Sequence, residues 1–267
     1  MRLRLLTCVL VYLASQASGE NSIEAYFLND SVNGFQLSDA YETHSMGLIY
    51  RNTSNYFNLD LAIVSPDMWV YRNRYREANR SFGEIISIEF GENVDPSMSL
   101  AKYMRIRGSG KFGLDAAQDF AHRVLSLQPV KEVNELVRMP DSFWWGVGLR
   151  KDFLISRQPT RQSNVDIDFY AGTDRAALKA NYTQRHYSRT PLTYTYGVGL
   201  ELIAYDNIVS APPILPQERH IIPNVHFGLT YDFDAFSIYV RDTFSLPTIS
   251  SDDDLYGVLS AGLIYKF

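Results

Sequence analysis

The segment 256–267 alternates strictly between two kinds of position. One series is apolar and aromatic (Leu259, Ala261, Leu263, Tyr265 and Phe267), and the other is mixed (Val258, Ser260, Gly262, Ile264 and Lys266). A period of two residues is that of a β-strand whose two faces meet different surroundings. A lipid-facing side and a mixed inner side would explain this pattern. The segment therefore favours an all-β fold, a closed antiparallel transmembrane β-barrel.

The first residues have the features of a secretory signal. Residues 1–4 read Met-Arg-Leu-Arg, residues 5–13 are apolar, and residues 17–19 are small. We expect residues 1–19 to be a cleaved signal peptide and residues 20–267 to form one barrel domain. Together with the aromatic residue that closes the last strand, this signal predicts a protein of the bacterial outer membrane.

Composition excludes several classes of protein. The apolar run 5–13 is shorter than the ~20 residues that a spanning helix needs, and no later run is longer, so we expect the chain to cross the membrane as strands. Cys8 is the only cysteine and lies within the expected signal, which excludes a cysteine nucleophile and a disulfide in the rest of the chain. The formal net charge of −5 argues against a nucleic-acid binder.

Alternation and turn residues predict an even number of strands, as a closed bacterial barrel requires. The expected strands are 21–29, 43–52, 56–65, 82–91, 101–109, 142–155, 163–171, 174–185, 193–205, 222–232, 234–243 and 256–267. We interpret the short connections 170–174 and 231–234 as periplasmic hairpins. Trp144 and Trp145, at the start of one strand, are interpreted as an aromatic anchor at the membrane interface.

One segment departs from the strand pattern. Residues 112–127 have apolar residues at helical spacing, which predicts a short helix in a loop. Asp115, Gln118 and His122 are spaced so that they can line one side of this helix. Such a polar side can carry a functional site, or it can simply be the solvated face of the helix.

Two further motifs lie near the start of the expected barrel domain. Asn29 and Asp30 close the first strand, and His44-Ser45-Met46-Gly47 opens the second. An Asn-Asp pair at a strand end is often turn chemistry, because both side chains can satisfy local backbone groups. The same oxygen-bearing side chains can also contribute to a site.

The order of these motifs is more specific than any one of them. Along the chain come Asn29-Asp30, Ser45 two residues before Gly47, Pro66-Asp67, Arg80-Ser-Phe-Gly83, a segment from Gly113 to His122 that contains Gln118, and a final strand that begins Tyr-Gly. This order resembles the lipid A 3'-O-deacylase family, also called LpxR. The resemblance implies an LpxR-like outer-membrane barrel of about twelve strands that removes the 3'-acyloxyacyl group of lipid A with calcium.

The resemblance also implies roles for individual residues. His122 would be the general base that activates water for attack on the ester carbonyl, with Gln118 one helical turn before it. Asn29, Asp30 and Ser45 would contribute to the active site and bind Ca²⁺, a hard cation that prefers oxygen ligands. The implied partner is lipid A, within lipopolysaccharide of the outer leaflet, and we expect a membrane-embedded monomer.

The chain departs from the family pattern in two places. The acidic partner expected about six residues after the histidine is replaced by Gln128, and the nearest carboxylates are Glu132 and Glu135. The family's lysine near the third and fourth strands is missing, and only arginines are available there (Arg72, Arg74, Arg76 and Arg80). Neither replacement is chemically equivalent. A second hypothesis therefore stays open, a non-enzymatic barrel of the same fold, porin-like or structural, whose site has decayed.

Overall fold

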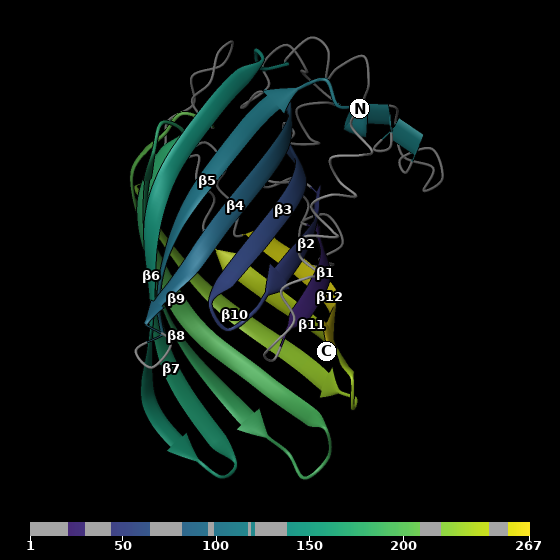
Figure 1. Cartoon of the computed structure of the whole chain (residues 1–267), viewed down its shortest axis with the longest axis vertical. Coiled ribbons are helices and arrows are strands. Elements are labelled where there is room, and N and C mark those ends of the chain that lie inside the picture. The colour runs from purple at the N-terminus through teal and green to yellow at the C-terminus, as the bar shows by residue number, and fades with distance from the viewer. Residues whose placement is uncertain are drawn as a thin grey trace.

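The computed structural model describes residues 21–29, 44–64, 82–95, 99–116, 119–120, 138–208, 220–245 and 256–267. These residues form a closed barrel of twelve strands (Figure 1). The strands are β1 (Ser22–Asn29), β2 (His44–Arg51), β3 (Asn55–Val64), β4 (Gly83–Asp95), β5 (Leu100–Gly110), β6 (Ser142–Gln158), β7 (Arg161–Gly172), β8 (Arg175–Tyr187), β9 (Leu192–Asp206), β10 (Ile221–Asp232), β11 (Phe236–Ser245) and β12 (Tyr256–Lys266). The predicted fold class is confirmed. The expected signal peptide lies outside the described residues.

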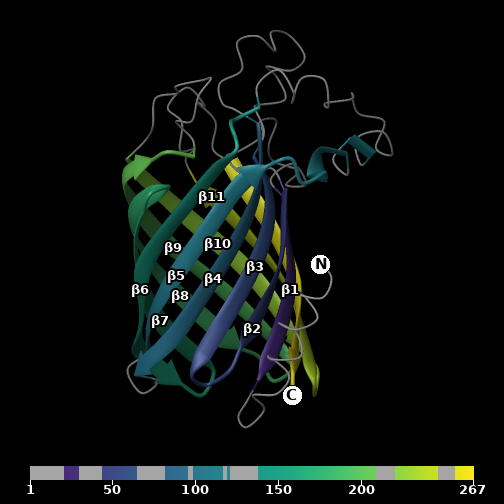
Figure 2. The same cartoon turned by 45° about the horizontal axis from the view of Figure 1, so that its top comes forward.

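Every strand pairs antiparallel with its neighbours in sequence, and β1 closes the ring by pairing with β12. Ser22 lies opposite Lys266, and Asn29 lies opposite Leu259. The start of β1 and the end of β12 therefore lie at the same end of the barrel, which we call the terminus end. The opposite side, where β1 ends and β2 begins, is the loop end (Figure 2).

Chain direction decides which connections lie at each end. The turns 52–54, 159–160, 188–191 and 233–235 lie at the terminus end, because each follows an even-numbered strand. The turn 173–174 follows β7 and therefore lies at the loop end. The prediction that 170–174 and 231–234 are both periplasmic hairpins was wrong, since these two turns lie at opposite ends of the barrel. A short connection shows that two consecutive strands are neighbours, but it does not show at which end of the barrel the connection lies.

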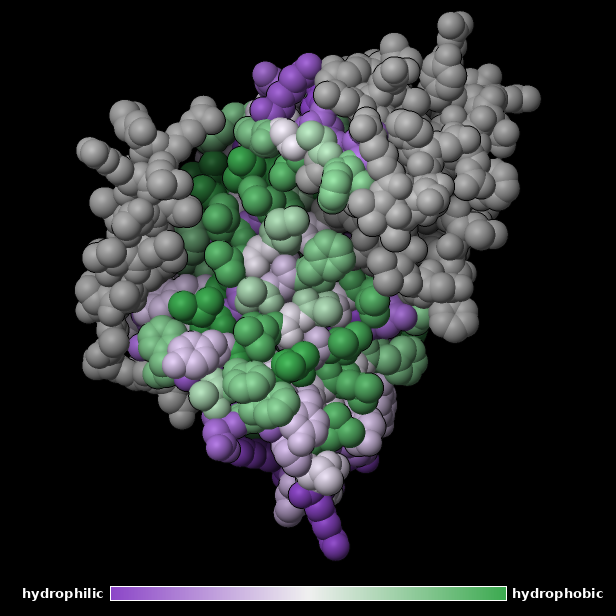
Figure 3. All heavy atoms as spheres, turned by 90° about the vertical axis from the view of Figure 1, so that its right-hand side faces the viewer, coloured by the Kyte–Doolittle hydropathy of each residue, from purple (hydrophilic) through white to green (hydrophobic). Residues whose placement is uncertain are grey.

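The outer wall is apolar and the inner wall is largely polar. Ile23 and Phe27 are 38% and 42% exposed on the outside, whereas Glu24 and Tyr26, from the intervening positions, line a cavity inside the barrel. Figure 3 shows hydrophobic residues gathered over the middle of one side of the wall, with hydrophilic residues toward its ends. An apolar outside around a polar inside is the arrangement of transmembrane barrels.

No helix in the described part of the chain is long and apolar enough to cross a membrane.

Inward-facing tyrosines lie over glycines of adjoining strands. A Cβ atom at Gly148 would lie 2.2 Å from the ring of Tyr103, and one at Gly91 would lie 1.8 Å from the ring of Tyr56. Both distances are below any real contact, so only glycine leaves room for these rings. The same relationship links Gly47 with Tyr26, Gly146 with Tyr170, and Gly262 with Tyr239.

The lumen contains an ionic network on the β3–β7 side. Glu89 accepts hydrogen bonds from the Arg105 guanidinium at 2.5 Å and from the Tyr56 hydroxyl at 2.7 Å. Arg150 donates to Asp168 at 2.8 Å and lies 3.7 Å from Glu89. These opposite charges neutralise one another, which allows charged side chains to occupy the interior.

An apolar cluster lies toward the loop end of the barrel, formed by Ala62, Val64, Ile85, Met139, Trp144 and Ile208. Trp144 is only 7% exposed there, whereas its neighbour Trp145 is 53% exposed. The interpretation of both tryptophans as one interfacial anchor is therefore wrong for Trp144, because successive residues of a strand face opposite sides of the wall.

Candidate functional site

The register brings two of the predicted site residues close together at the loop end. Asn29 ends β1 opposite His44, and Ser45 lies in β2 opposite Leu28. Asn29 and Ser45 are therefore one position apart on adjoining strands. The other predicted site residues, Asp30, Gln118 and His122, lie outside the described residues, as do Gln128, Glu132, Glu135 and the arginines 72–80.

Ser45 is buried on the inner side of the wall. It is 1% exposed, and its Oγ atom lies beside the Asp60 carboxylate without a hydrogen bond of ordinary geometry to another described residue. Asp60 also accepts a hydrogen bond of 2.6 Å from the Tyr26 hydroxyl. Serine and aspartate oxygens are donors that suit a hard cation such as calcium. The residues present at this point therefore fit the ion that the resemblance implies.

Asn29 and Ser45 belong to opposite faces of the strand pattern. Position 29 continues the outward series of Ile23 and Phe27, whereas Ser45 continues the inward series with Gly47. An ion bound by both residues would have to lie at the rim, where the two faces of the wall meet. Among the residues that the structure describes, no three histidine, cysteine, aspartate or glutamate side chains gather as a metal site.

A second cluster lies on the outer face at the loop end and holds the helical segment that the sequence predicted. Residues 114–116 and 119–120 are helical, and Figures 1 and 2 show this segment outside the ring of strands. Glu84 at the start of β4 accepts hydrogen bonds from the backbone N–H groups of Phe112 at 2.6 Å and Leu114 at 3.1 Å. The first N–H groups of a helix have no partner within the helix, so Glu84 caps it from the barrel wall.

Arg138, which lies shortly before β6, completes this cluster. Its guanidinium lies 3.3 Å from the Glu84 carboxylate and 3.1 Å from that of Asp115, over the ring of Phe82. Glu84 and Phe82 are fully buried although they face outward. The helical segment and Arg138 therefore cover the outer wall at this point.

The described part of the helix buries acidic residues. Asp115 is 9% exposed and Asp119 is 5% exposed, whereas Phe120 is 69% exposed. The interpretation of Asp115 as part of a solvated face is wrong, because Arg138 binds this carboxylate and offsets the cost of burying it. Gly113, just before the helix, has a φ of +86°, a backbone conformation that favours glycine.

Sequence reasoning missed Asp60, Glu84 and Arg138. The sequence does mark Glu84, since it is the one charged residue among the outward-facing positions Glu84, Ile86, Ile88 and Phe90. Asp60 similarly stands in a strand of mostly apolar residues. No local pattern marks Arg138, which joins the cluster through a contact 54 residues away in the chain.

Comparison with known proteins shows the fold. No protein-family model matches this sequence, and no curated protein matches it either. The structure is similar to that of LpxR from Salmonella typhimurium, with 11% sequence identity, a TM-score of 0.67, and coverage of 92% of this chain and 100% of that chain. More distant similarity is found to the KdgM porin in complex with disordered oligogalacturonate (10% identity, TM-score 0.43, 92% of this chain and 99% of that chain) and to the NanC porin (6% identity, TM-score 0.46, 93% and 100%).

Proposed function

We propose that this chain is an outer-membrane hydrolase that cleaves an acyl ester of lipid A, the 3'-acyloxyacyl ester. The observation that carries the proposal is the cluster around Glu84, which holds a helical segment against the outer face of the wall at the loop end. Long loops of bacterial barrels face the cell exterior, so this is the level of the outer leaflet. An active site at the rim of the wall, at this level, would meet the acyl chains of a lipid without removing the lipid from the membrane.

The sequence resemblance and the structural similarity support the same proposal. The similarity to LpxR extends over 92% of this chain. Two of the residues that the resemblance assigns, Asn29 and Ser45, are brought together at the loop end. In the sequence, Gln118 and His122 follow four and eight residues after Leu114, the helical residue whose backbone N–H the barrel wall binds.

In the proposed reaction, His122 accepts a proton from water while the water oxygen attacks the ester carbonyl. The bond between the acyl carbon and the sugar oxygen then breaks, the fatty acid leaves, and the sugar oxygen takes up the proton. Asn29, Asp30 and Ser45 would hold calcium, which would supply positive charge to the developing oxyanion. Asp60 would add a carboxylate oxygen beside Ser45.

Mass spectrometry of lipid A from a deacylase-free Gram-negative host that expresses the chain tests this proposal. We expect loss of the 3'-acyloxyacyl group with the wild-type chain, no loss with His122→Ala, and recovery of activity in membranes when calcium is restored after chelation. His186→Ala is the matched control, because His186 lies near the terminus end and stacks on Tyr196. Unaltered lipid A in the presence of folded wild-type barrel would overturn the proposal.

A non-enzymatic barrel is the second candidate. Gln128 and the missing lysine favour it, and so does the polar cavity inside the barrel. This candidate predicts unchanged lipid A, no effect of calcium, and tolerance of substitutions at His122 and Asp30. The same mass-spectrometric experiment therefore separates the two candidates.

A further inference from the structure

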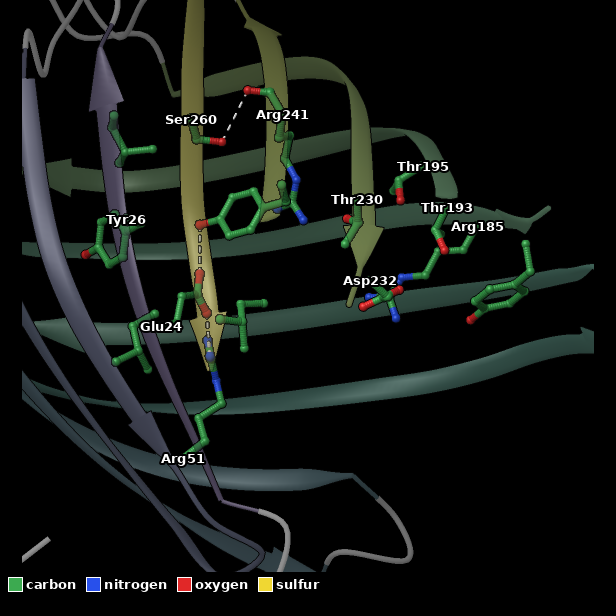
Figure 4. A pocket seen from close by; sticks show the side chains of 15 residues that line it. Glu24, Tyr26, Arg51, Arg185, Thr193, Thr195, Thr230, Asp232, Arg241 and Ser260 are labelled. Carbon is green, nitrogen blue, oxygen red and sulfur yellow. Dashed lines mark hydrogen bonds and ion pairs between the residues drawn. The ribbon is translucent and has the colours of Figure 1, made fainter. Parts of the chain in front are cut away.

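A polar cavity of about 600 Å³ lies inside the barrel toward the terminus end. It is lined by a continuous arc of the wall that runs from β8 through β12 to β1 and β2. Figure 4 shows Glu24 and Arg51 on one side of this cavity, and Arg185, Arg241, Thr230 and Asp232 on the other. The lining contains three arginines and two carboxylates, together with the hydroxyl groups of threonine, serine and tyrosine residues.

Both carboxylates of the cavity already have partners. Glu24 lies 2.5 Å from the Arg51 guanidinium and accepts a hydrogen bond of 2.7 Å from Tyr239. Asp232 accepts a hydrogen bond of 2.5 Å from Ser237 and lies 3.5 Å from the Lys266 ammonium group. Of the three arginines, Arg51 is therefore neutralised by Glu24.

Arg185 and Arg241 are the remaining cations. Among the described residues, neither guanidinium forms an ion pair with a carboxylate. Both side chains are exposed to the lumen, where water can be replaced by a ligand. Two unpaired guanidinium groups in one cavity favour an anion.

The strand register aligns these two arginines. Arg185 lies opposite Thr195, Thr195 lies opposite Gly228, and Gly228 lies opposite Arg241. Three strand spacings separate the two arginine backbones by about 14 Å. A Cβ atom built on Gly228 would lie 3.6 Å from the Cβ and 3.7 Å from the Cγ of Arg241. The aliphatic part of the Arg241 side chain therefore lies beside Gly228.

Hydroxyl groups surround the two arginines. Thr195 lies in the same row, and Thr193 lies opposite Thr230 in the next inward row toward the terminus end. Hydroxyl groups donate and accept hydrogen bonds, so they match a ligand with hydroxyl groups of its own. The volume lies within the range of pockets that hold small molecules.

We infer that this cavity binds an acidic sugar, a hydroxyl-rich molecule that carries one phosphate or carboxylate group between Arg185 and Arg241. The planar guanidinium groups would bind the oxyanion through paired hydrogen bonds, and Thr193, Thr195 and Thr230 would bind the sugar hydroxyls. The inference does not depend on the proposed lipid hydrolysis, because Arg185 in β8 and Arg241 in β11 are not among the residues assigned to that reaction.

Calorimetric titration of the full chain, folded in detergent micelles at low salt, tests this inference. The probes are glucose 6-phosphate, glucuronate, inorganic phosphate and glucose. We expect at least one of the two acidic sugars to bind more tightly than inorganic phosphate and glucose, with an affinity that falls as salt is added. Tighter binding of glucose 6-phosphate would identify a phosphate ligand, and tighter binding of glucuronate a carboxylate ligand.

Variants of the two arginines separate this site from nonspecific binding. Arg185→Gln and Arg241→Gln should each weaken binding about tenfold or more, the factor expected for the loss of one charge-assisted pair of hydrogen bonds. Arg189→Gln, in the turn between β8 and β9, is the matched control and should leave the affinity unchanged. Heat-modifiable electrophoretic mobility establishes that each variant is folded. Undiminished binding by both folded variants, or no preference for either acidic sugar, would overturn the inference.

Discussion

Glu84 and Arg138 are 54 residues apart in the chain, yet their side chains form an ion pair of 3.3 Å on the outer face of the barrel. Glu84 also accepts hydrogen bonds from the backbone of Phe112 and Leu114, where the chain leaves β5. Arg138 lies just before the chain enters β6. The pair therefore fastens both ends of the excursion between β5 and β6 to the barrel wall.

Replacement of Glu84 by glutamine should release the helical segment while the barrel stays folded. Breaking a buried ion pair on one side costs about 3 kcal/mol, and this cost falls on the local contacts rather than on the strand pairing. Hydrogen exchange of the Phe112 and Leu114 amides should become at least tenfold faster, and the proposed deacylation should fall by a similar factor. Glu92→Gln, which removes an exposed partner of Lys102, is the control. Unchanged exchange in Glu84→Gln would show that the segment is held by other contacts.

The strands follow from the sequence because their alternation is a local property. All twelve expected strands exist, and most of their ends agree within a few residues. The closure of β1 on β12 also follows, because an open sheet would leave unpaired edges in a membrane. By contrast, the positions of Glu84 and Arg138 depend on contacts between distant segments, and alternation along one strand does not report them.

The tyrosine and glycine pairs can be predicted only when the pairing register of the neighbouring strands is known. Gly148 and Tyr103 lie opposite each other on β6 and β5, a fact that neither strand reveals alone. The site shows the same limit. Sequence order suggested that Asn29 and Ser45 act together, and the register does place them on adjoining strands, but it also assigns them to opposite faces of the wall.

Gly148→Ala should destabilise the barrel, because the new methyl group would overlap the Tyr103 ring at 2.2 Å. Overpacking of this kind costs about 1–3 kcal/mol in the free energy of unfolding, measurable by urea titration of the barrel in lipid vesicles. In the double variant with Tyr103→Ala the overlap is gone, so the two effects should not add. Gly108→Ala is the control, since its methyl group would meet only the Ser142 carbonyl oxygen at 3.7 Å. Additive effects would show that Tyr103 does not require Gly148.

Glu89→Gln should destabilise the barrel through the luminal network. The Glu89 side chain is only 5% exposed and interacts with Arg105, Arg150 and Tyr56, so neutralising it leaves two arginines with less compensation. We expect a loss of about 3 kcal/mol in the free energy of unfolding. Asp234→Asn, in the exposed turn after β10, is the control and should change stability by less than about 0.5 kcal/mol. Equal stabilities of the two variants would mean that water in the lumen compensates for the lost charge.

Asp242 is a carboxylate on the lipid-facing side of the wall. It lies opposite Phe227 and Leu259, and with Val240 it lines an outer groove of about 420 Å³. Phe227 is the seventh of the twelve residues of β10, which places Asp242 near the middle of the wall. A charged group at this depth of a membrane raises the free energy of the folded barrel.

Asp242→Leu should stabilise the barrel by about 1 kcal/mol in the free energy of unfolding, measured in lipid vesicles. The gain from removing a charge from contact with acyl chains should exceed the loss of the contacts of this carboxylate, among them the hydrogen bond that it accepts from the Thr243 backbone N–H. The opposite kind of change, Val240→Asp in the otherwise unaltered chain, adds a second carboxylate to the same outward face and should destabilise the barrel by a similar amount. In detergent solutions with thin, mobile micelles both effects should shrink, since water then reaches the wall more easily. A loss of stability in Asp242→Leu would show that the hydrogen bond from Thr243 and the other contacts of this carboxylate outweigh the cost of its position.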